Sequence, residues 1–267
     1  MIPTLFQLGP VAVHSYGLFV ALAFLAAIGL ASRRGRRVGI KPEHFVDLGL
    51  AALLGGLAAA RVTFVALDPQ VGWRELPYLW TGGLSFYGGL AGGIAACAVY
   101  ARLRRLAFPA ALDAAAPALA LGYAIARVGC FLNGCCYGAP TALPWGCRFR
   151  EVALGGLTPP SHPAQLYAAA GSLVVMGLLL AGERRVRVPG QLFLAYLGLY
   201  GVLRFLVEIF RRGYSATVMV GGLTQAQVAS LALILGAGLA AWALERRARH
   251  GRARTAAGAC GGGGGKA

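Results

Sequence analysis

Apolar residues gather into seven long segments along the chain, and short polar or charged stretches separate them. A helix needs about 20 apolar residues to cross the bilayer core, and each segment is close to that length. The seven segments are about 13–31, 45–67, 84–101, 109–131, 163–181, 190–210 and 225–244. This pattern predicts an all-α integral membrane protein with seven transmembrane helices.

Composition supports the same class of protein. Hydrophobic residues make up 58% of the chain and charged residues 13%, whereas soluble globular chains carry about 25% charged residues. The 40 glycines suit helices that approach closely, because tight backbone packing drives helix association in lipid. The spacing of Gly88 with Gly92 and of Gly89 with Gly93 predicts such a contact in the third segment.

The formal net charge of +16 does not indicate a nucleic-acid partner, because the basic residues lie between spans and do not collect on a soluble domain. Seventeen of the 25 basic residues follow the first, third, fifth and seventh segments. The positive-inside rule makes that side cytoplasmic, so we expect the N-terminus outside and the C-terminus in the cytoplasm. Small periplasmic head segments are then expected in outward loops at about 68–83, 132–162 and 211–224.

The composition of each end of the chain predicts its structural role. The first 32 residues contain no lysine or arginine, so no cleavable signal peptide is predicted and the first span is retained. The seven-helix domain is expected over residues 1–250. Residues 251–267 are rich in arginine and glycine and lack apolar periodicity, which predicts a disordered cytoplasmic tail.

Three arginines lie within predicted spans or near their outer ends: Arg61, Arg127 and Arg204. A charge in lipid costs about 2.5–3.5 kcal/mol on insertion scales, so such arginines are candidate functional residues. Glu208 follows Arg204 by four residues, on the same helix face, where a carboxylate can orient the guanidinium. Since guanidinium groups bind phosphate in a bidentate manner, the set predicts a site for a lipid phosphate. The alternative is that each arginine reaches the interface or pairs with an acid.

Four cysteines, Cys130, Cys135, Cys136 and Cys147, lie within 18 residues on the predicted outer side. In an oxidising compartment such thiols commonly pair or bind metal, and the loop is long enough for a disulfide from Cys135 or Cys136 to Cys147. A four-cysteine zinc site is a second interpretation, although the adjacent pair lacks the usual gap of about two to four residues. The third is packing of small side chains in a glycine-rich turn. No metal ligand is assigned from the sequence.

Six blocks, in order and spread over nearly the whole chain, resemble the prolipoprotein diacylglyceryl transferases of bacterial inner membranes. The blocks are Ser15-Tyr16-Gly17-Leu18, the segment around Arg61, the segment from Gly82 to Gly89, Asp113 and Pro117 with the signature from Arg127 to Gly138, the segment from Ser161 to Tyr167, and the segment from Arg204 to Glu208. Together with seven predicted spans, these blocks make the resemblance specific.

The resemblance implies an enzyme that transfers the diacylglyceryl group of phosphatidylglycerol to the lipobox cysteine thiol of a preprolipoprotein and releases glycerol phosphate. It implies phosphatidylglycerol, preprolipoprotein signal peptides and membrane lipid as partners. It implies neither a cofactor nor a nucleic-acid partner, and it places the protein in the bacterial inner membrane with several spans.

The resemblance also implies roles for individual residues. Arg127 and Arg204 are expected to hold the phosphate, and Glu208 is expected to orient Arg204. The remaining candidate substrate-binding residues are Tyr16, Arg61, Asn133, Gly138 and His162. For Asn133 a helix cap is an alternative, and for His162 a structural hydrogen bond is an alternative.

Three motif positions depart from the family pattern. Tyr87 stands where the family usually has a histidine proposed as the base, Cys130 where it usually has asparagine, and Cys135 where it usually has glutamate. Tyrosine accepts a proton only if nearby cations lower its pKa from about 10, and packing or hydrogen bonding is the alternative role. Glu208 and His162 are further candidate bases. A dedicated base is unnecessary if the arginines lower the pKa of the substrate thiol.

Two other classes of protein stay open. A catalytically divergent relative that binds phospholipid or lipoprotein without transfer would keep the same blocks. A small-solute transporter also has several spans and buried arginines, but this sequence shows neither an inverted repeat nor a chain of intramembrane acids.

Overall fold

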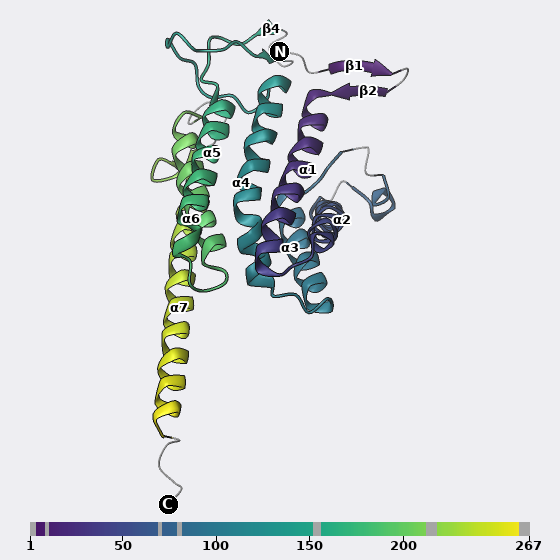
Figure 1. The fold of residues 1–267 in the computed structure, drawn as a ribbon. Coiled ribbons are helices and arrows are strands. Elements are labelled where there is room, and N and C mark those ends of the chain that lie inside the picture. Colours follow the sequence, from purple (N-terminus) through teal and green to yellow (C-terminus); the bar gives the residue numbers. More distant parts are fainter. Residues whose placement is uncertain are drawn as a thin grey trace, which may run out of the picture. The chain divides into compact units, whose positions relative to one another are not determined.

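The computed structural model describes residues 4–8, 11–68, 71–78, 82–151, 156–211 and 218–261. Within these ranges the main elements are seven helices (Figure 1): α1 (Ser15–Gly35), α2 (Pro42–Leu67), α3 (Phe86–Leu103), α4 (Phe108–Asn133), α5 (Ala164–Gly182), α6 (Gln191–Ile209) and α7 (Gln225–Gly261). Each is long and apolar enough to cross a bilayer. The predicted all-α membrane protein with seven transmembrane helices is therefore confirmed.

Short elements connect the helices. The antiparallel strand pairs are β1 (Thr4–Leu8) with β2 (Val11–His14), β3 (Arg150–Glu151) with β4 (Gly156–Leu157), and β5 (Val218–Val220) with β6 (Leu223–Thr224). The 3-10 turns are η1 (Arg36–Val38), η2 (Trp73–Glu75) and η4 (Glu183–Arg185). The sequence pattern predicted none of the strand pairs, because their runs are too short to show a clear period of two.

The last helix is longer than the sequence predicted. α7 runs to Gly261, so it includes residues 251–261, which we expected to belong to a disordered tail. Alanine and arginine fill much of that stretch, and both have high helix propensity. The rest of the expected tail, residues 262–267, lies outside the described residues.

The chain forms two compact units, one of residues 1–27 with 116–267 and the other of residues 28–115. In the second unit, α2 and α3 pack against each other through glycines. A Cβ on Gly92 would lie 2.7 Å from Gly55 O. A Cβ on Gly88 would lie 2.8 Å from Ala59 O. Only glycine permits this approach of the two backbones, so the close helix contact predicted from the glycine spacing is confirmed.

In the first unit, α4, α5 and α6 pack around a core of small and branched apolar side chains. Its most buried members come from α4, α5 and α6 and are Ala116, Ala120, Val175, Leu179 and Leu192. Ser172 of α5 adds a polar link, because its hydroxyl donates to Ala120 O at 2.8 Å. α7 packs along α6, where a Cβ on Gly201 would lie 3.1 Å from Ser230 O. Nearer the candidate site, Ala164 and Ala168 of α5 and Val207 of α6 form a second buried cluster, against which Tyr123 of α4 packs.

Candidate active site

Glu208, near the end of α6, is the centre of the polar contacts in the first unit. The residue is 3% exposed. Arg204 Nη1 donates to Glu208 Oε2 from one helical turn earlier, and Arg211 Nη1 lies 3.5 Å from the same oxygen. Thr224 Oγ1 donates to the other oxygen, Oε1, at 3.2 Å. The predicted Arg204–Glu208 pair is therefore present, and one carboxylate between two guanidinium groups leaves an excess positive charge.

Thr224 is held in place by the start of α7. Its hydroxyl accepts from Gln227 N at 3.2 Å, and its own backbone N donates to Gln227 Oε1 at 3.1 Å. These reciprocal bonds form a capping box, which the spacing Thr-x-x-Gln favours. The cap of α7 therefore positions the hydroxyl that contacts Glu208.

Arg127 comes from the last turns of α4. Its guanidinium lies over the ring of Tyr123, 4.6 Å from the centroid, which is a favourable cation–π distance. The Tyr123 ring meets Tyr200 of α6 edge to face, with centroids 5.4 Å apart. The charges of Arg127 and Arg204 both act on Tyr200. The two predicted phosphate ligands thus come from different helices and flank one pair of tyrosines.

Tyr16 lies at the start of α1 in the same unit and is 46% exposed. Electrostatic interactions link its phenol to Arg127 and to the cysteines of the signature segment. The structure thus brings Tyr16 to the end of α4 that carries Arg127, where a bound headgroup can meet a hydroxyl as well as a guanidinium.

Gly138 and His162 hold the loop after α4. Gly138 N donates to His162 O at 2.8 Å, and His162 N donates to Ala139 O at 3.0 Å. Nδ1 of His162 lies 3.3 Å from the Tyr167 hydroxyl. A Cβ on Gly138 would lie 2.5 Å from Phe210 O, so the loop passes against the end of α6 only with glycine at this position. The structural hydrogen bond considered for His162 is therefore present.

A Schellman motif ends α4. Gly134 has a φ of 80°, and its N donates to Phe131 O at 3.1 Å, while Cys135 N donates to Cys130 O at 3.1 Å. In this motif the residue after the glycine folds back over the last helical turn. Glycine adopts the required left-handed conformation without strain, and Cys135 is thereby placed beside Cys130.

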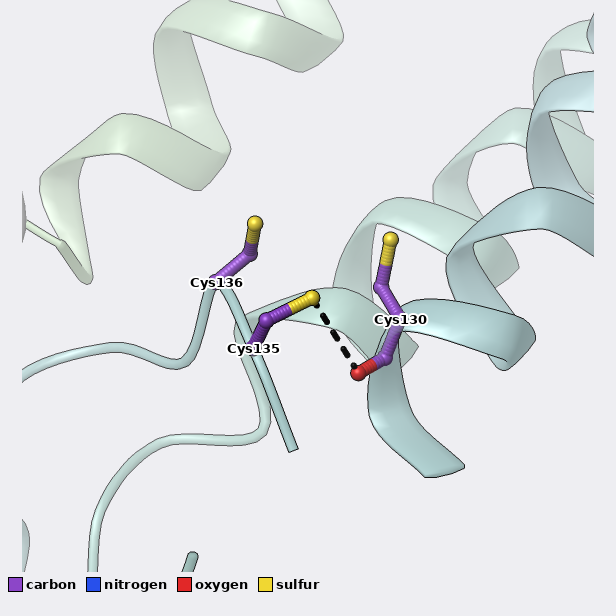
Figure 2. A group of neighbouring side chains, drawn as sticks. All are labelled: Cys130, Cys135 and Cys136. Carbon is purple, nitrogen blue, oxygen red and sulfur yellow. Dashed lines mark hydrogen bonds between the residues drawn. The ribbon is translucent and has the colours of Figure 1, made fainter. Parts of the chain in front are cut away.

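Three of the four cysteines between residues 130 and 147 form one group (Figure 2). The sulfur atoms of Cys130, Cys135 and Cys136 all lie within 4.8 Å of one another. Cys147 stands outside this group, and its Sγ donates to Trp145 O at 3.5 Å. These four cysteines are all free. The structure therefore does not contain the disulfide considered between Cys147 and either Cys135 or Cys136.

Polar and charged neighbours surround the group. Asn133 is the last residue of α4, two positions before Cys135. The Cys135 thiol donates to Cys130 O at 3.7 Å, and the charges of Arg127 and Arg211 act on Cys136. The backbone carbonyl of Cys135 accepts from Gln165 Nε2 at 2.6 Å. The turn that carries the thiols is thus fastened to α5.

Arg61 lies in α2, in the unit of residues 28–115, and is 2% exposed. Its Nη1 donates to Gly82 O and, at 3.1 Å, to Gly83 O, and its Nη2 donates to Glu75 O at 2.7 Å. The guanidinium therefore ties the loop between α2 and α3 to the helix. This structural role was not predicted from the sequence, and the headgroup role of Arg61 stays a prediction.

Tyr87, the second residue of α3, is 65% exposed. Its ring packs edge to face on Phe86, with centroids 5.6 Å apart. Like Arg61, it belongs to the unit of residues 28–115, whereas the other candidate residues belong to the first unit. Its role as a base stays a prediction.

Sequence reasoning missed several residues that hold the site together. They are Tyr123, Gln165, Tyr200, Arg211 and Thr224. Two of them could have been predicted from their spacing in the sequence. Arg211 follows Glu208 by three residues, on the same helix face, and Thr224 opens a capping-box spacing. The tyrosine pair and Gln165 contact residues from other helices, so no local pattern marked them.

A seven-helix membrane fold with a buried carboxylate, paired arginines and an excess of positive charge defines an integral membrane protein whose polar centre suits an anionic ligand. The family model for prolipoprotein diacylglyceryl transferase matches residues 3–243. The chain belongs to this family.

Several curated relatives are similar over most of their length. A protein of Trichormus variabilis is 33% identical, over 92% of this chain and 90% of its own. A protein of Bordetella bronchiseptica is 34% identical, over 89% and 93%. A protein of Geobacillus kaustophilus is 35% identical, over 93% and 94%. All three are named phosphatidylglycerol–prolipoprotein diacylglyceryl transferase.

Proposed function

We propose that this protein transfers the diacylglyceryl group from phosphatidylglycerol to the lipobox cysteine thiol of preprolipoproteins, forms a thioether and releases glycerol phosphate. This is the first step of lipoprotein maturation. Membership of the family and the names of the relatives support the reaction. The observation that carries it in the structure is the Glu208 centre, which holds Arg204 and Arg211 around one buried carboxylate.

The leaving group requires positive charge. When the bond between the diacylglyceryl carbon and the phosphate oxygen breaks, the electron pair stays on the phosphate, and fixed cations stabilise it. Arg127 and Arg204 supply guanidinium groups from two helices. Because Glu208 and the Tyr123 ring already hold these groups, little reorganisation is needed as the charge develops.

Glu208 acts in this proposal as the residue that positions the cations. One of its oxygens contacts two guanidinium groups and the other accepts from Thr224. Both oxygens of the carboxylate are therefore already engaged. We therefore assign the removal of the thiol proton to another group.

The substrates reach the site from the membrane. Phosphatidylglycerol and the signal peptide of a preprolipoprotein both enter from the lipid in this proposal. The protein lies in a bacterial inner membrane with its N-terminus outside, and the Glu208 centre lies on the outer side. The clustering of basic residues after alternate spans supports this orientation.

The deciding experiment gives the purified full-length protein phosphatidylglycerol and a lipobox peptide, and measures the thioether product by mass spectrometry. Complementation of a strain depleted of its own diacylglyceryl transferase is the matching test in cells. We expect wild-type protein to yield product in both. Folded, membrane-inserted protein that binds phosphatidylglycerol but makes no thioether would favour the divergent, non-transferring relative instead.

A further inference from the structure

The group of Cys130, Cys135 and Cys136 has the spacing of a metal site. A zinc ion binds thiolate sulfur at about 2.3 Å, so sulfur atoms in a tetrahedral site lie about 3.8 Å apart. The three sulfurs already lie within 4.8 Å of one another. Figure 2 shows the three side chains side by side, with the Cys135 sulfur directed at Cys130 O, to which it donates at 3.7 Å. A bound metal ion would replace that hydrogen bond and draw the three sulfurs together.

The backbone fixes this spacing. The Schellman motif at Gly134 places Cys135 over Cys130, and Gln165 fastens the carbonyl of Cys135 to α5. Cys136 has a φ of 66°, a left-handed conformation that costs a non-glycine residue of order 1–3 kcal/mol. Strain of this kind persists where the surrounding structure imposes it, and here it accompanies the convergence of three thiols.

The charges near the group favour an anionic metal complex. Three thiolates around Zn²⁺ carry a net charge of −1. The charges of Arg127 and Arg211 act on Cys136. Cations around metal-bound thiolates stabilise them. The guanidinium groups stay protonated and do not compete as ligands.

The number of ligands indicates the type of site. Structural zinc sites are closed by four protein ligands, whereas catalytic sites have three and keep one position open. Among the described residues of the first unit, no further histidine, cysteine or carboxylate joins the group, and Cys147 stands apart from it. The structure thus offers three ligands.

We propose that Cys130, Cys135 and Cys136 bind one Zn²⁺ ion, and that its fourth position binds the lipobox thiol of the substrate as a thiolate. The second clause rests on the proposed transferase function. The site would supply a way of activating the nucleophile, because metal coordination holds a thiol in its deprotonated form.

The chemistry is balanced without a further reagent. The thiol releases its proton to solvent when its sulfur coordinates the metal, because metal binding requires the deprotonated form. The sulfur then attacks the diacylglyceryl carbon that bears the phosphate. A carbon–sulfur bond forms and a carbon–oxygen bond breaks. The electron pair leaves with the phosphate, which Arg127 and Arg204 stabilise. The product thioether is neutral and a weaker ligand, so it leaves the metal.

Metal binding is tested on the full-length protein purified without chelator. We expect about one zinc per chain by elemental analysis, and loss of that zinc in Cys136→Ser and Cys130→Ser. The control variants Cys97→Ser and Cys147→Ser change cysteines outside the group and should keep it. Replacement of zinc with Co²⁺ should give the thiolate-to-cobalt charge-transfer absorption of a tetrahedral site, and the absorption should weaken when any one of the three cysteines is changed.

Three results would overturn the metal site: no binding when Zn²⁺ alone is added to the reduced protein, equal binding by Cys136→Ser, or a disulfide among the three cysteines in protein purified under native conditions. The last is detected by mass spectrometry with and without alkylation.

The open position is tested on the cobalt-loaded protein. A lipobox peptide should shift the visible cobalt spectrum, and the same peptide with serine in place of its cysteine should not. Metal-free protein should lose most of its transferase activity and regain it with Zn²⁺. Unchanged transfer after complete metal removal would overturn thiol activation while the proposed function stood. A cobalt spectrum of three thiolates in a protein that never forms thioether would overturn the proposed function while the metal site stood.

Discussion

Thr224 Oγ1 donates a hydrogen bond to Glu208 Oε1 at 3.2 Å, so the cap of α7 contacts the carboxylate that pairs with Arg204 of α6 and with Arg211 beyond its end. The same hydroxyl accepts from Gln227 N. The Thr224 hydroxyl thus has two roles. It accepts from a backbone N–H at the start of α7 that would otherwise have no partner within the helix, and it fixes one oxygen of Glu208. The start of α7 and the end of α6 therefore hold Glu208 together, and Glu208 in turn fixes the positions of Arg204 and Arg211.

Changing Thr224 to alanine should remove both the cap of α7 and the hydrogen bond to Glu208. We expect the loss of about 1 kcal/mol of stability from the missing cap, together with slower transfer because Glu208 loses its hydroxyl partner. Thermal unfolding in detergent measures the first effect and the thioether assay measures the second. Thr224→Ser keeps the hydroxyl and should restore most of both. Equal behaviour of the alanine and serine variants would contradict this account.

Changing Arg204 to alanine should lower kcat/KM by about 10²-fold, which is the scale for removing one preorganised donor at a developing oxyanion. The matched control is Arg249→Ala. Arg249 pairs with Glu245 at the same i,i+4 spacing but is exposed in the last part of α7, so its removal should leave transfer unchanged. Similar losses in both variants would show that the effect is not specific to the site.

Changing Glu208 to glutamine should reduce transfer without removing any cation. The amide cannot neutralise Arg204 and Arg211, so the two guanidinium groups repel each other and lose their fixed positions. We expect a lower rate together with weaker protection of the α6 end in hydrogen exchange. Normal transfer by Glu208→Gln and by Arg204→Ala would rule out the phosphate site.

Changing Gly129 to alanine should destabilise the first unit. A Cβ there would lie 2.5 Å from Phe19 Cβ, so α1 and α4 could no longer approach. The control is Gly177→Ala in α5, where nothing lies within 4 Å of an added Cβ. That change should be neutral or stabilising by up to about 1 kcal/mol, because alanine has the higher helix propensity. The amount of folded protein and its midpoint of thermal unfolding distinguish the two.

Changing Arg61 to lysine keeps the charge but removes the planar fork that reaches three backbone carbonyls. We expect a loss of at least about 2 kcal/mol of stability, since hydrogen bonds to a buried charged group are lost. The loop should also open, so that trypsin cuts faster after Arg74, which is exposed in η2. Arg74→Ala is the control for stability. An unchanged cleavage rate in Arg61→Lys would remove the proposed role of Arg61 in the loop.

The sequence predicted the seven helices well, because the requirement for a span is local. About 20 successive apolar residues are sufficient to mark a helix in lipid, whatever it packs against. The Arg204–Glu208 pair was predictable for the same reason, since an i,i+4 spacing puts both side chains on one helix face. The glycine spacing in α3 likewise predicted a close helix contact.

The arrangement of the site depended on contacts that no local pattern contains. The sequence could show four nearby cysteines, but only the turn at Gly134 decided that Cys135 and Cys136 join Cys130 and that Cys147 does not. It could show that Arg61 is unusual, but only the folded loop supplied the carbonyls that it binds. Helix formation in a membrane follows from short-range composition, whereas the direction of a side chain follows from backbone turns and from partners that are distant in the chain.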